Sequence, residues 1–352
     1  MPDQFFAKQL KGETPLSFNT AKQLCSLAER ILAHRPWQQL LETDLVFLRR
    51  DPADLRVCSV MGALGEVFVV VAYQGMEGYH FFQKFQTTET APPDDYYGEQ
   101  RSVFLEYEKS TALTAPDREM LQAVGYPITR GARLPIFRAL RPGYHPWYLA
   151  DSEGAALADV LTAMLFVCER LAAGRPDWWD KAGSYPLLTR AADAQGQPHF
   201  TVEQFAPPPI AMPSVTPPAI DPERLERSRS RKRAAGVLQL DHFFMAARIG
   251  GANERKSLAR VVLAVDGGSG FVYPPEMGGP EEDTGKLLAD AVLKMLEAGA
   301  PPPREIHVRS DEYCAALEPL AAALGARILV RNSLPALDRA RDALLLRMGG
   351  GH

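Results

Sequence analysis

The sequence has few cysteines, and none of them is paired at a metal-binding spacing. Its four cysteines, Cys25, Cys58, Cys168 and Cys314, stand far apart, and no C-x-x-C motif occurs. This spacing argues against both a disulfide framework and a zinc cluster, because each needs paired cysteines. We expect buried thiols in a protein of the reducing cytoplasm.

Long apolar runs are absent as well. The first residues, MPDQFFAKQLKGE, lack the apolar core of a signal peptide. No run approaches the roughly 18–20 residues that a helix needs to cross a membrane. The sequence therefore predicts a cytoplasmic protein with no membrane partner.

Neither sign of charge is in large excess. The net charge is −4 at pH 7 and the sequence pI is about 6.0, so the whole chain offers no electrostatic attraction to nucleic acid. One basic tract, residues 224–233, is an exception. It is a candidate for contacts to nucleic-acid phosphates, which carry no base-sequence specificity. A solvated charge run beside a linker is the simpler interpretation. The residues that we consider for phosphate binding are Arg229, Arg231, Lys232 and Arg233.

Three common catalytic signatures are missing. The sequence contains no H-E-x-x-H, no G-x-S-x-G and no phosphate-binding P-loop. Zinc proteases, hydrolases with a nucleophile elbow and P-loop NTPases therefore have no support.

A proline-rich segment divides the chain into two parts. The 352 residues, 46% of them hydrophobic and 23% charged, suit a folded protein of two domains. Seven prolines fall between Ala206 and Pro222, a density that forbids helix and favours a stiff linker. We predict an N-terminal domain over 1–205, a linker over 206–222 and a C-terminal domain over 223–352.

The N-terminal part combines helical and strand patterns. Short β-favouring segments separated by glycine and proline predict an antiparallel meander, and apolar helical patterns flank it. Such helices pack across the sheet and give an α+β domain. The expected helices are 20–33, 116–124 and 153–172, and the expected strands are 45–50, 56–61, 67–73, 79–85 and 101–107. Thr114, with Asp117 three residues on, is expected to cap the second of these helices.

The C-terminal part shows strand and helix patterns in an order that few folds share. Three strands come first, and helices then alternate with strands, which indicates an α/β domain. That order is the order of the ribonuclease H-like fold, which hosts nucleases, transposases and integrases. The expected strands are 236–249, 258–266, 270–277, 305–309 and 326–330, and the expected helices are 281–298, 311–324 and 335–348.

Both parts resemble modules of one protein family. The runs "SVMGALGEVFVVVAYQGMEGYHFF" and "GYPITRGARLPIFRALRPGYHPWYLADSEGAAL" resemble the N-terminal module of an uncharacterised bacterial family. The runs "RVVLAVDGGSGFVYPPEMG" and "PPPREIHVRSDEYCAALEPLAAALGARILV" resemble the module that accompanies it. The resemblance supports the two-module interpretation and supplies no catalytic residues.

Ribonuclease H-like enzymes transfer phosphoryl groups with two metal ions. Carboxylates from the first strand, the end of the fourth strand and a late helix converge on Mg²⁺. Here Asp241 lies in the first strand, Asp311 follows the fourth, and Asp338 or Asp342 lies on the last helix. One hypothesis is therefore a metal-dependent nuclease or strand-transfer enzyme that uses Asp241, Asp311 and Asp342, with Asp241 and Asp311 as metal ligands.

The same carboxylates also have ordinary explanations. Asp311 stands where a helix begins, with Ser310 beside it as a capping residue. Asp338 and Asp342 alternate with arginines on a helix whose other face is apolar, a pattern typical of a solvated charged face. Asp266 opens the run DGGSG, which resembles a phosphate-binding loop, but a tight hairpin turn explains it better.

A loop rich in aromatic residues is a candidate ligand site. Tyr144, His145, Trp147 and Tyr148 stand between two prolines or beside them, as in a loop that closes on a small ligand. The alternative is a packed plug at the start of the next helix.

These observations favour a binding or interaction protein whose ribonuclease H-like domain lacks a full metal site. A metal-dependent nuclease is the first alternative, and small-ligand sensing through the loop at 144–148 is the second. The partner is a protein or a nucleic acid on the first two hypotheses, and Mg²⁺ is the cofactor only on the nuclease hypothesis.

Overall fold

The computed structural model describes residues 12–51, 53–87, 98–192, 198–209, 216–229, 236–251 and 254–349. The chain divides into two compact units. The first comprises residues 1–210 and 250–256, and the second comprises residues 211–249 and 257–352.

The first unit is built on a seven-stranded sheet in the order β5-β4-β3-β2-β1-β6-β7. Strands β1 to β5 pair antiparallel with their neighbours in sequence, as expected of a meander, and β6 joins β1 in parallel. The strands are β1 (Val46–Asp51), β2 (Asp54–Met61), β3 (Val69–Gln74), β4 (Ser102–Lys109), β5 (Arg133–Leu140), β6 (Tyr185–Ala192) and β7 (Pro198–Phe205).

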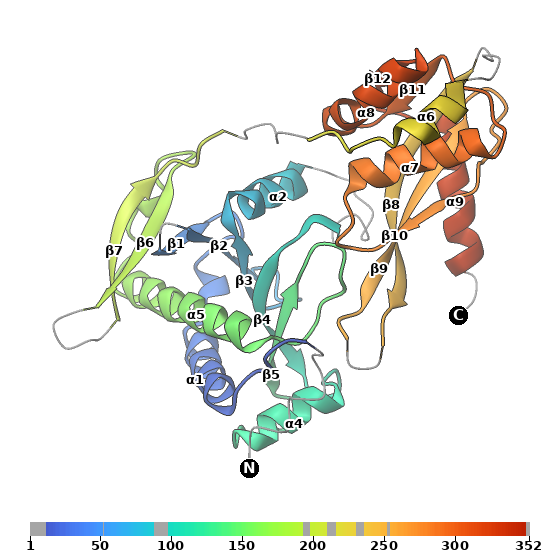
Figure 1. Cartoon of the computed structure of the whole chain (residues 1–352). Helices are drawn as coiled ribbons and strands as arrows, with labels where there is room; N and C mark the ends of the chain where they lie inside the picture. The colour runs from blue at the N-terminus through green and yellow to red at the C-terminus, as the bar shows by residue number, and fades with distance from the viewer. Residues whose placement is uncertain are drawn as a thin grey trace. The chain divides into compact units, whose positions relative to one another are not determined.

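Helices cover both faces of this sheet. The long apolar helices α1 (Phe18–His34) and α5 (Asp151–Ala172) pack together on one face, and α4 (Ala115–Ala123) adds to the same core. On the other face, α2 (Gly75–Thr87) lies over β2 and β3 (Figure 1). Short 3₁₀ turns η1 (Pro36–Gln38) and η2 (Asp177–Trp179) complete the unit.

One predicted strand of this unit is wrong. Residues 79–85 were expected as a strand, but they lie inside α2. The aromatic residues of this run have helical spacing: Tyr79 and Phe82 are buried against the sheet, and Phe81 and Phe85, four residues apart, stack on each other. Gly75, with φ of +68°, lets the chain turn directly from β3 into the helix.

The second unit has a five-stranded sheet in the order β10-β9-β8-β11-β12. Strand β9 runs antiparallel to β8 and β10, whereas β11 runs parallel to β8 and β12. Each strand expected from the sequence forms, although the third is much shorter than predicted. The strands are β8 (Val237–Ile249), β9 (Ser257–Asp266), β10 (Glu276–Gly278), β11 (Glu305–Val308) and β12 (Arg327–Val330).

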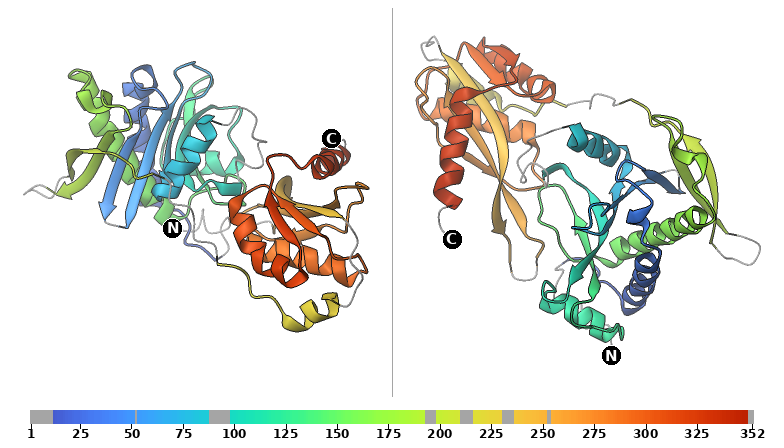
Figure 2. Two further views of the ribbon diagram at one scale, coloured as in Figure 1. Left: turned by 90° about the horizontal axis from the view of Figure 1, so that it is seen from above. Right: turned by 180° about the vertical axis from the view of Figure 1, so that it is seen from behind.

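Helices lie on opposite faces of this second sheet. Helices α7 (Thr284–Glu297) and α8 (Asp311–Leu324) share one hydrophobic core with it. Helix α9 (Pro335–Gly349) packs on the other face, over Phe243 and Val261, and Figure 2 shows it in front of the strands when they are seen from behind. The short α6 (Pro222–Arg229) contributes Leu225 to the first of these cores.

The cysteines are free thiols, and three of them are core residues. Cys25, Cys58 and Cys168 are buried, and burial raises the pKa of each to about 12, which makes them poor nucleophiles. In the described part of the chain, no helix is both long enough and apolar enough to cross a membrane.

Candidate functional site

The middle of β8 carries a buried carboxylate. Asp241 is only 7% exposed, and it lies on the face of the sheet that α9 covers, between the core residue Phe243 and Gln239. The Gln239 side-chain oxygen accepts hydrogen bonds from the backbone N–H groups of Ala336 and Leu337, at 2.9 and 3.0 Å. The side chain of Gln239 therefore caps the first turn of α9 and fixes that helix to β8.

An arginine joins Asp241 to a carboxylate of α9. Arg309 follows directly after β11, and its Nε donates to Asp241 Oδ2 at 2.5 Å. Its Nη2 donates to Asp338 Oδ1. The two carboxylates thus share one guanidinium, and we call Asp241, Arg309 and Asp338 the acid–arginine–acid cluster.

Electrostatics keep this arginine charged. Burial lowers the pKa of Arg309, but the charges and hydrogen bonds of Asp241 and Asp338 outweigh that effect, and the net pKa is raised. Arg309 Nη1 also donates to the backbone oxygen of Asn332, at 3.3 Å. The guanidinium is therefore held by three groups from two segments of the chain.

A second polar contact adjoins the cluster. The backbone N–H of His242 donates to Asp241 Oδ1 at 2.9 Å. The His242 ring nitrogen Nδ1 lies 2.9 Å from the hydroxyl of Tyr313 on α8. Neighbouring residues of β8 thus make polar contacts on the two sides of the sheet.

The other predicted acids lie apart from this cluster. Asp311 is the first residue of α8 and is exposed, and Ser310 caps the helix by accepting from the Tyr313 N–H at 3.2 Å. The Asp342 side chain is 64% exposed and lies 3.5 Å from Arg341. Within the described ranges, no three His, Cys, Asp or Glu side chains are grouped as metal ligands.

The sequence interpretation missed Arg309. Arg309 ends the fourth predicted strand, which is where a ribonuclease H-like metal site has an acid. The sequence prediction considered only carboxylates here and therefore named Asp311, two residues further on.

The aromatic loop at 144–148 is tied into the first unit. Tyr144, His145, Trp147 and Tyr148 are all half-buried. The backbone of Trp147 pairs with that of Ala139 in β5, at 2.8 and 3.0 Å. This bridge extends the sheet by one position and holds the loop against β5.

Tyr148 belongs to a polar network around the buried Asp117. Its hydroxyl lies 2.9 Å from Thr114 Oγ1, and its ring lies under Arg138, with 4.4 Å from Cζ to the ring centroid. Arg138 makes a two-pronged ion pair with Asp117, at 2.8 and 2.6 Å. Thr114 and Asp117 form the predicted capping box of α4. Tyr148 therefore has structural contacts in this network.

The basic tract lies only partly within the described residues. Arg224 donates to Asp290 and Glu297 of α7, so this first arginine of the tract is engaged within its own unit. Arg229 is the last residue of α6, while Arg231, Lys232 and Arg233 lie outside the described residues. The proposed phosphate contacts therefore stay a prediction.

Asp266 is explained by a turn. Its Oδ1 accepts from the Ser269 backbone N–H at 2.6 Å, from the Ser269 hydroxyl at 2.7 Å and from the Gly268 N–H at 3.2 Å. These hydrogen bonds lower the pKa of Asp266. The carboxylate thus satisfies the donors of its own loop.

Comparison with known families agrees with the two-part organisation. Residues 22–190 match a domain of unknown function, DUF7309. Residues 224–345 match another domain of unknown function, DUF6930. The chain is a two-module protein of uncharacterised domain families. None of the curated proteins matches it. The DUF6930 module contains the acid–arginine–acid cluster, and the DUF7309 module contains most of the first unit's sheet.

Proposed function

We propose that the DUF6930 module is a ribonuclease H-like domain that binds a partner and does not catalyse phosphoryl transfer. The fold part of this proposal is supported by the strand order β10-β9-β8-β11-β12, with β9 alone antiparallel to the others. It is also supported by the placing of α7 and α8 on one face of the sheet and α9 on the other.

The observation that carries the proposal is the position of Arg309. A two-metal site needs carboxylates from the first strand, the end of the fourth strand and the last helix to surround cations. Here the first strand and the last helix supply Asp241 and Asp338, but the end of the fourth strand supplies a guanidinium that binds both. The cluster does not suit Mg²⁺, because its positive charge is already present in Arg309.

The rival hypothesis, a metal-dependent nuclease that uses Asp241, Asp311 and Asp342, needs Arg309 to release Asp241. That change would break the ion pair between the half-buried Arg309 and the buried Asp241, which disfavours it. It would also need the exposed carboxylates of Asp311 and Asp342 to approach Asp241. The geometry favours the binding role over the nuclease.

Exposed apolar side chains next to a cleft support a binding role. Phe271 is 59% exposed, and Met277 on the edge strand β10 is 51% exposed. A cleft of about 830 Å³ adjoins Phe271, and its lining also includes Tyr273 and Met295. An apolar edge beside a cleft is a common form of partner-binding surface.

The test is a nuclease assay with the full chain. Single-stranded DNA, duplex DNA and an RNA–DNA hybrid are incubated with wild type and with Asp241→Asn, each in Mg²⁺ and in Mn²⁺. We expect no cleavage above background from either protein. Metal-dependent cleavage by wild type that Asp241→Asn abolishes would overturn the proposal, because it would show that Asp241 serves catalysis.

A further inference from the structure

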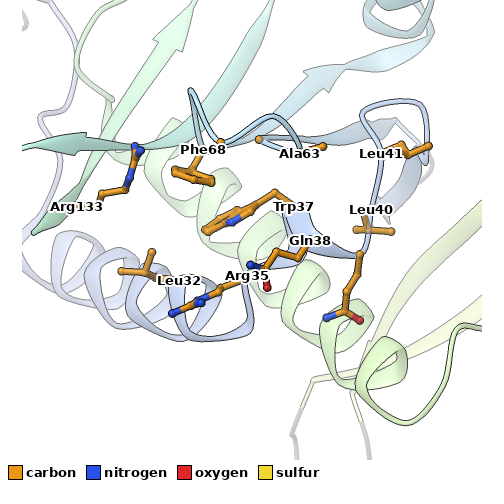
Figure 3. Close-up of a pocket in the computed structure, with 12 residues that line it drawn as sticks. Leu32, Arg35, Trp37, Gln38, Leu40, Leu41, Ala63, Phe68 and Arg133 are labelled. Atoms are coloured by element: carbon orange, nitrogen blue, oxygen red, sulfur yellow. The ribbon is translucent and has the colours of Figure 1, made fainter.

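The first unit contains a cavity of about 780 Å³ where the end of α1 meets the turn between β2 and β3 (Figure 3). Its volume is typical of small-molecule sites, which are usually 300–1,000 Å³. As far as the structure describes it, the lining combines aromatic rings, aliphatic side chains and two arginines, and contains no carboxylate. The residues that matter for the argument are Leu32, Arg35, Trp37, Gly62, Phe68 and Arg133.

Two aromatic rings form one wall of this cavity. The centroids of the Trp37 and Phe68 rings are 4.6 Å apart, and Trp37 also packs edge-on against Tyr107 at 5.7 Å. Trp37 is 6% exposed, so its position is fixed by the core, whereas Phe68 is half-buried. Phe68 therefore offers a stacking surface to a flat apolar group, and Trp37 supports it from the core.

The two arginines flank the ring pair (Figure 3). Arg133 stacks over Phe68, with 4.1 Å from Cζ to the ring centroid. Its Nη1 donates a hydrogen bond to the Tyr107 backbone oxygen at 3.3 Å. Its other donors are available for hydrogen bonds. Within the described part of the chain, neither Arg133 nor Arg35 forms an ion pair with a carboxylate. Among the described residues, the lining of the cavity therefore has two arginines and no carboxylate to pair with them.

The backbone at Arg35 is strained. Arg35 ends α1 in the left-handed region, with φ of 49° and ψ of 58°, where glycine is the usual residue. Among the described residues, it is the one non-glycine residue with positive φ. An arginine in a glycine position is a local conflict of the kind that marks functional sites.

The turn that closes the cavity also depends on one residue. A Cβ on Gly62 would lie 2.7 Å from the Val67 backbone oxygen, 2.8 Å from Phe68 Cδ1 and 3.0 Å from Trp37 Cβ. Gly62 also has φ of +138°. Only glycine therefore lets this turn pack directly on the ring pair.

We propose that this cavity binds a small organic anion with a flat ring, the ring on Trp37 and Phe68 and the anionic group on Arg35 and Arg133. A carboxylate and a phosphate are both suited to the arginines, since each accepts charge-assisted hydrogen bonds from a guanidinium. The site lies away from the loop at 144–148, and the proposal does not depend on the function proposed for the second unit.

The experiment is calorimetric titration of the full chain with four probes. 1-Naphthoate represents an aromatic carboxylate and AMP a phosphate on a planar base, while 1-naphthalenemethanol and adenosine are their uncharged counterparts. We expect at least one of the two anions to bind with 1:1 stoichiometry and a Kd on the order of 10–100 µM. The uncharged counterpart of the anion that binds should bind at least about tenfold more weakly.

Variants connect the binding to the cavity. Arg133→Met and Arg35→Gly should each weaken the anion about tenfold. Arg35→Gly should also melt at or above the wild-type Tm, because it removes the left-handed strain. Arg130→Met, an exposed arginine outside the cavity, is the matched control and should bind as wild type does.

Several results would overturn the proposal. One such result is that neither anion binds to wild type. Another is that wild type binds an anion and its uncharged counterpart with equal affinity. Unchanged affinity in both Arg35→Gly and Arg133→Met would show that the ligand sits elsewhere. Because Arg35→Gly is expected to keep the fold, a loss of binding in that variant is not explained by unfolding.

Discussion

The first unit contains a buried ion pair between Asp117 and Arg138, in which each charge is stabilised by the other. The Asp117 side chain is 3% exposed and that of Arg138 is 12% exposed, and their ion pair has two hydrogen bonds. Removing one member of such a pair leaves a buried charge uncompensated, which costs about 3–5 kcal/mol. Arg138→Met should therefore lower the free energy of unfolding in urea by about that amount. The exposed control Arg130→Met should change it by less than about 0.5 kcal/mol, and equal effects of both variants would contradict the account.

The same pair predicts a pH dependence. Burial raises the pKa of Asp117, but its hydrogen bonds with Arg138 and Thr114 and the charge of Arg138 outweigh burial, so the net pKa is lowered. A carboxyl with a lower pKa in the folded state stabilises the fold above its unfolded pKa, about 3.9, and this contribution is lost as pH falls through the folded pKa. The free energy of unfolding is measured by urea titration at several pH values from 7 down to 2.5. The difference in this free energy between wild type and Asp117→Asn should become smaller below about pH 4. A difference that stays constant would contradict the assignment, and Asp342→Asn serves as the exposed control.

At the residue scale, the predictions from the sequence match the structure best where an interaction joins residues close together in the chain. The capping box of Thr114 and Asp117 and the cap at Ser310 were predicted because each depends on neighbours within three residues. The ion pair of Arg138 with Asp117 joins residues 21 apart, and the bond of Arg309 to Asp241 joins residues 68 apart. Such partners are set by tertiary packing, which no local pattern in one sequence encodes.

At the scale of elements, the most informative contact is the one between β8 and the first turn of α9. The first turn of α9 has unpaired N–H groups, and two of them are satisfied by Gln239 from inside the neighbouring strand. Gln239→Met should destabilise the second unit by about 1–2 kcal/mol, because these N–H groups lose their acceptor.

Hydrogen exchange measures this directly. Amides at the start of α9 should exchange faster in Gln239→Met than in wild type, while those of α7 should change much less. The control is Gln122→Met, an exposed substitution on α4. Unaltered protection of α9 in Gln239→Met would show that another contact fixes the helix.

Elements with a strong period were predictable, and those without one were not. Helix α8 was predicted with the bounds that it has, because a capped apolar pattern covers its whole length. Strand β5 was missed because Pro135 interrupts it, which an edge strand of the sheet tolerates and a central strand would not. The strand expected at 79–85 became a helix because its aromatic residues suit both periods, and packing against β2 and β3 decided between them.

At the scale of the whole molecule, the two units have separate cores. Among the residues that the structure describes, the hydrophobic clusters of the first unit contain none from the second unit, and those of the second contain none from the first. Scanning calorimetry of the full chain should therefore show two unfolding transitions. Arg138→Met should lower one of them and Gln239→Met the other. A single transition that both variants lower equally would contradict this independence.

The central claim is that Arg309 takes the place of a catalytic cation in the second unit, and metal binding tests it most directly. Mn²⁺ is titrated calorimetrically into wild type, Asp241→Asn, Arg309→Ala and the double variant Arg309→Ala with Asp241→Asn. Wild type should bind no Mn²⁺ at this cluster, whereas Arg309→Ala, with Asp241 and Asp338 released, should gain a site that the double variant lacks. Mn²⁺ binding by wild type that Asp241→Asn abolishes would contradict the account.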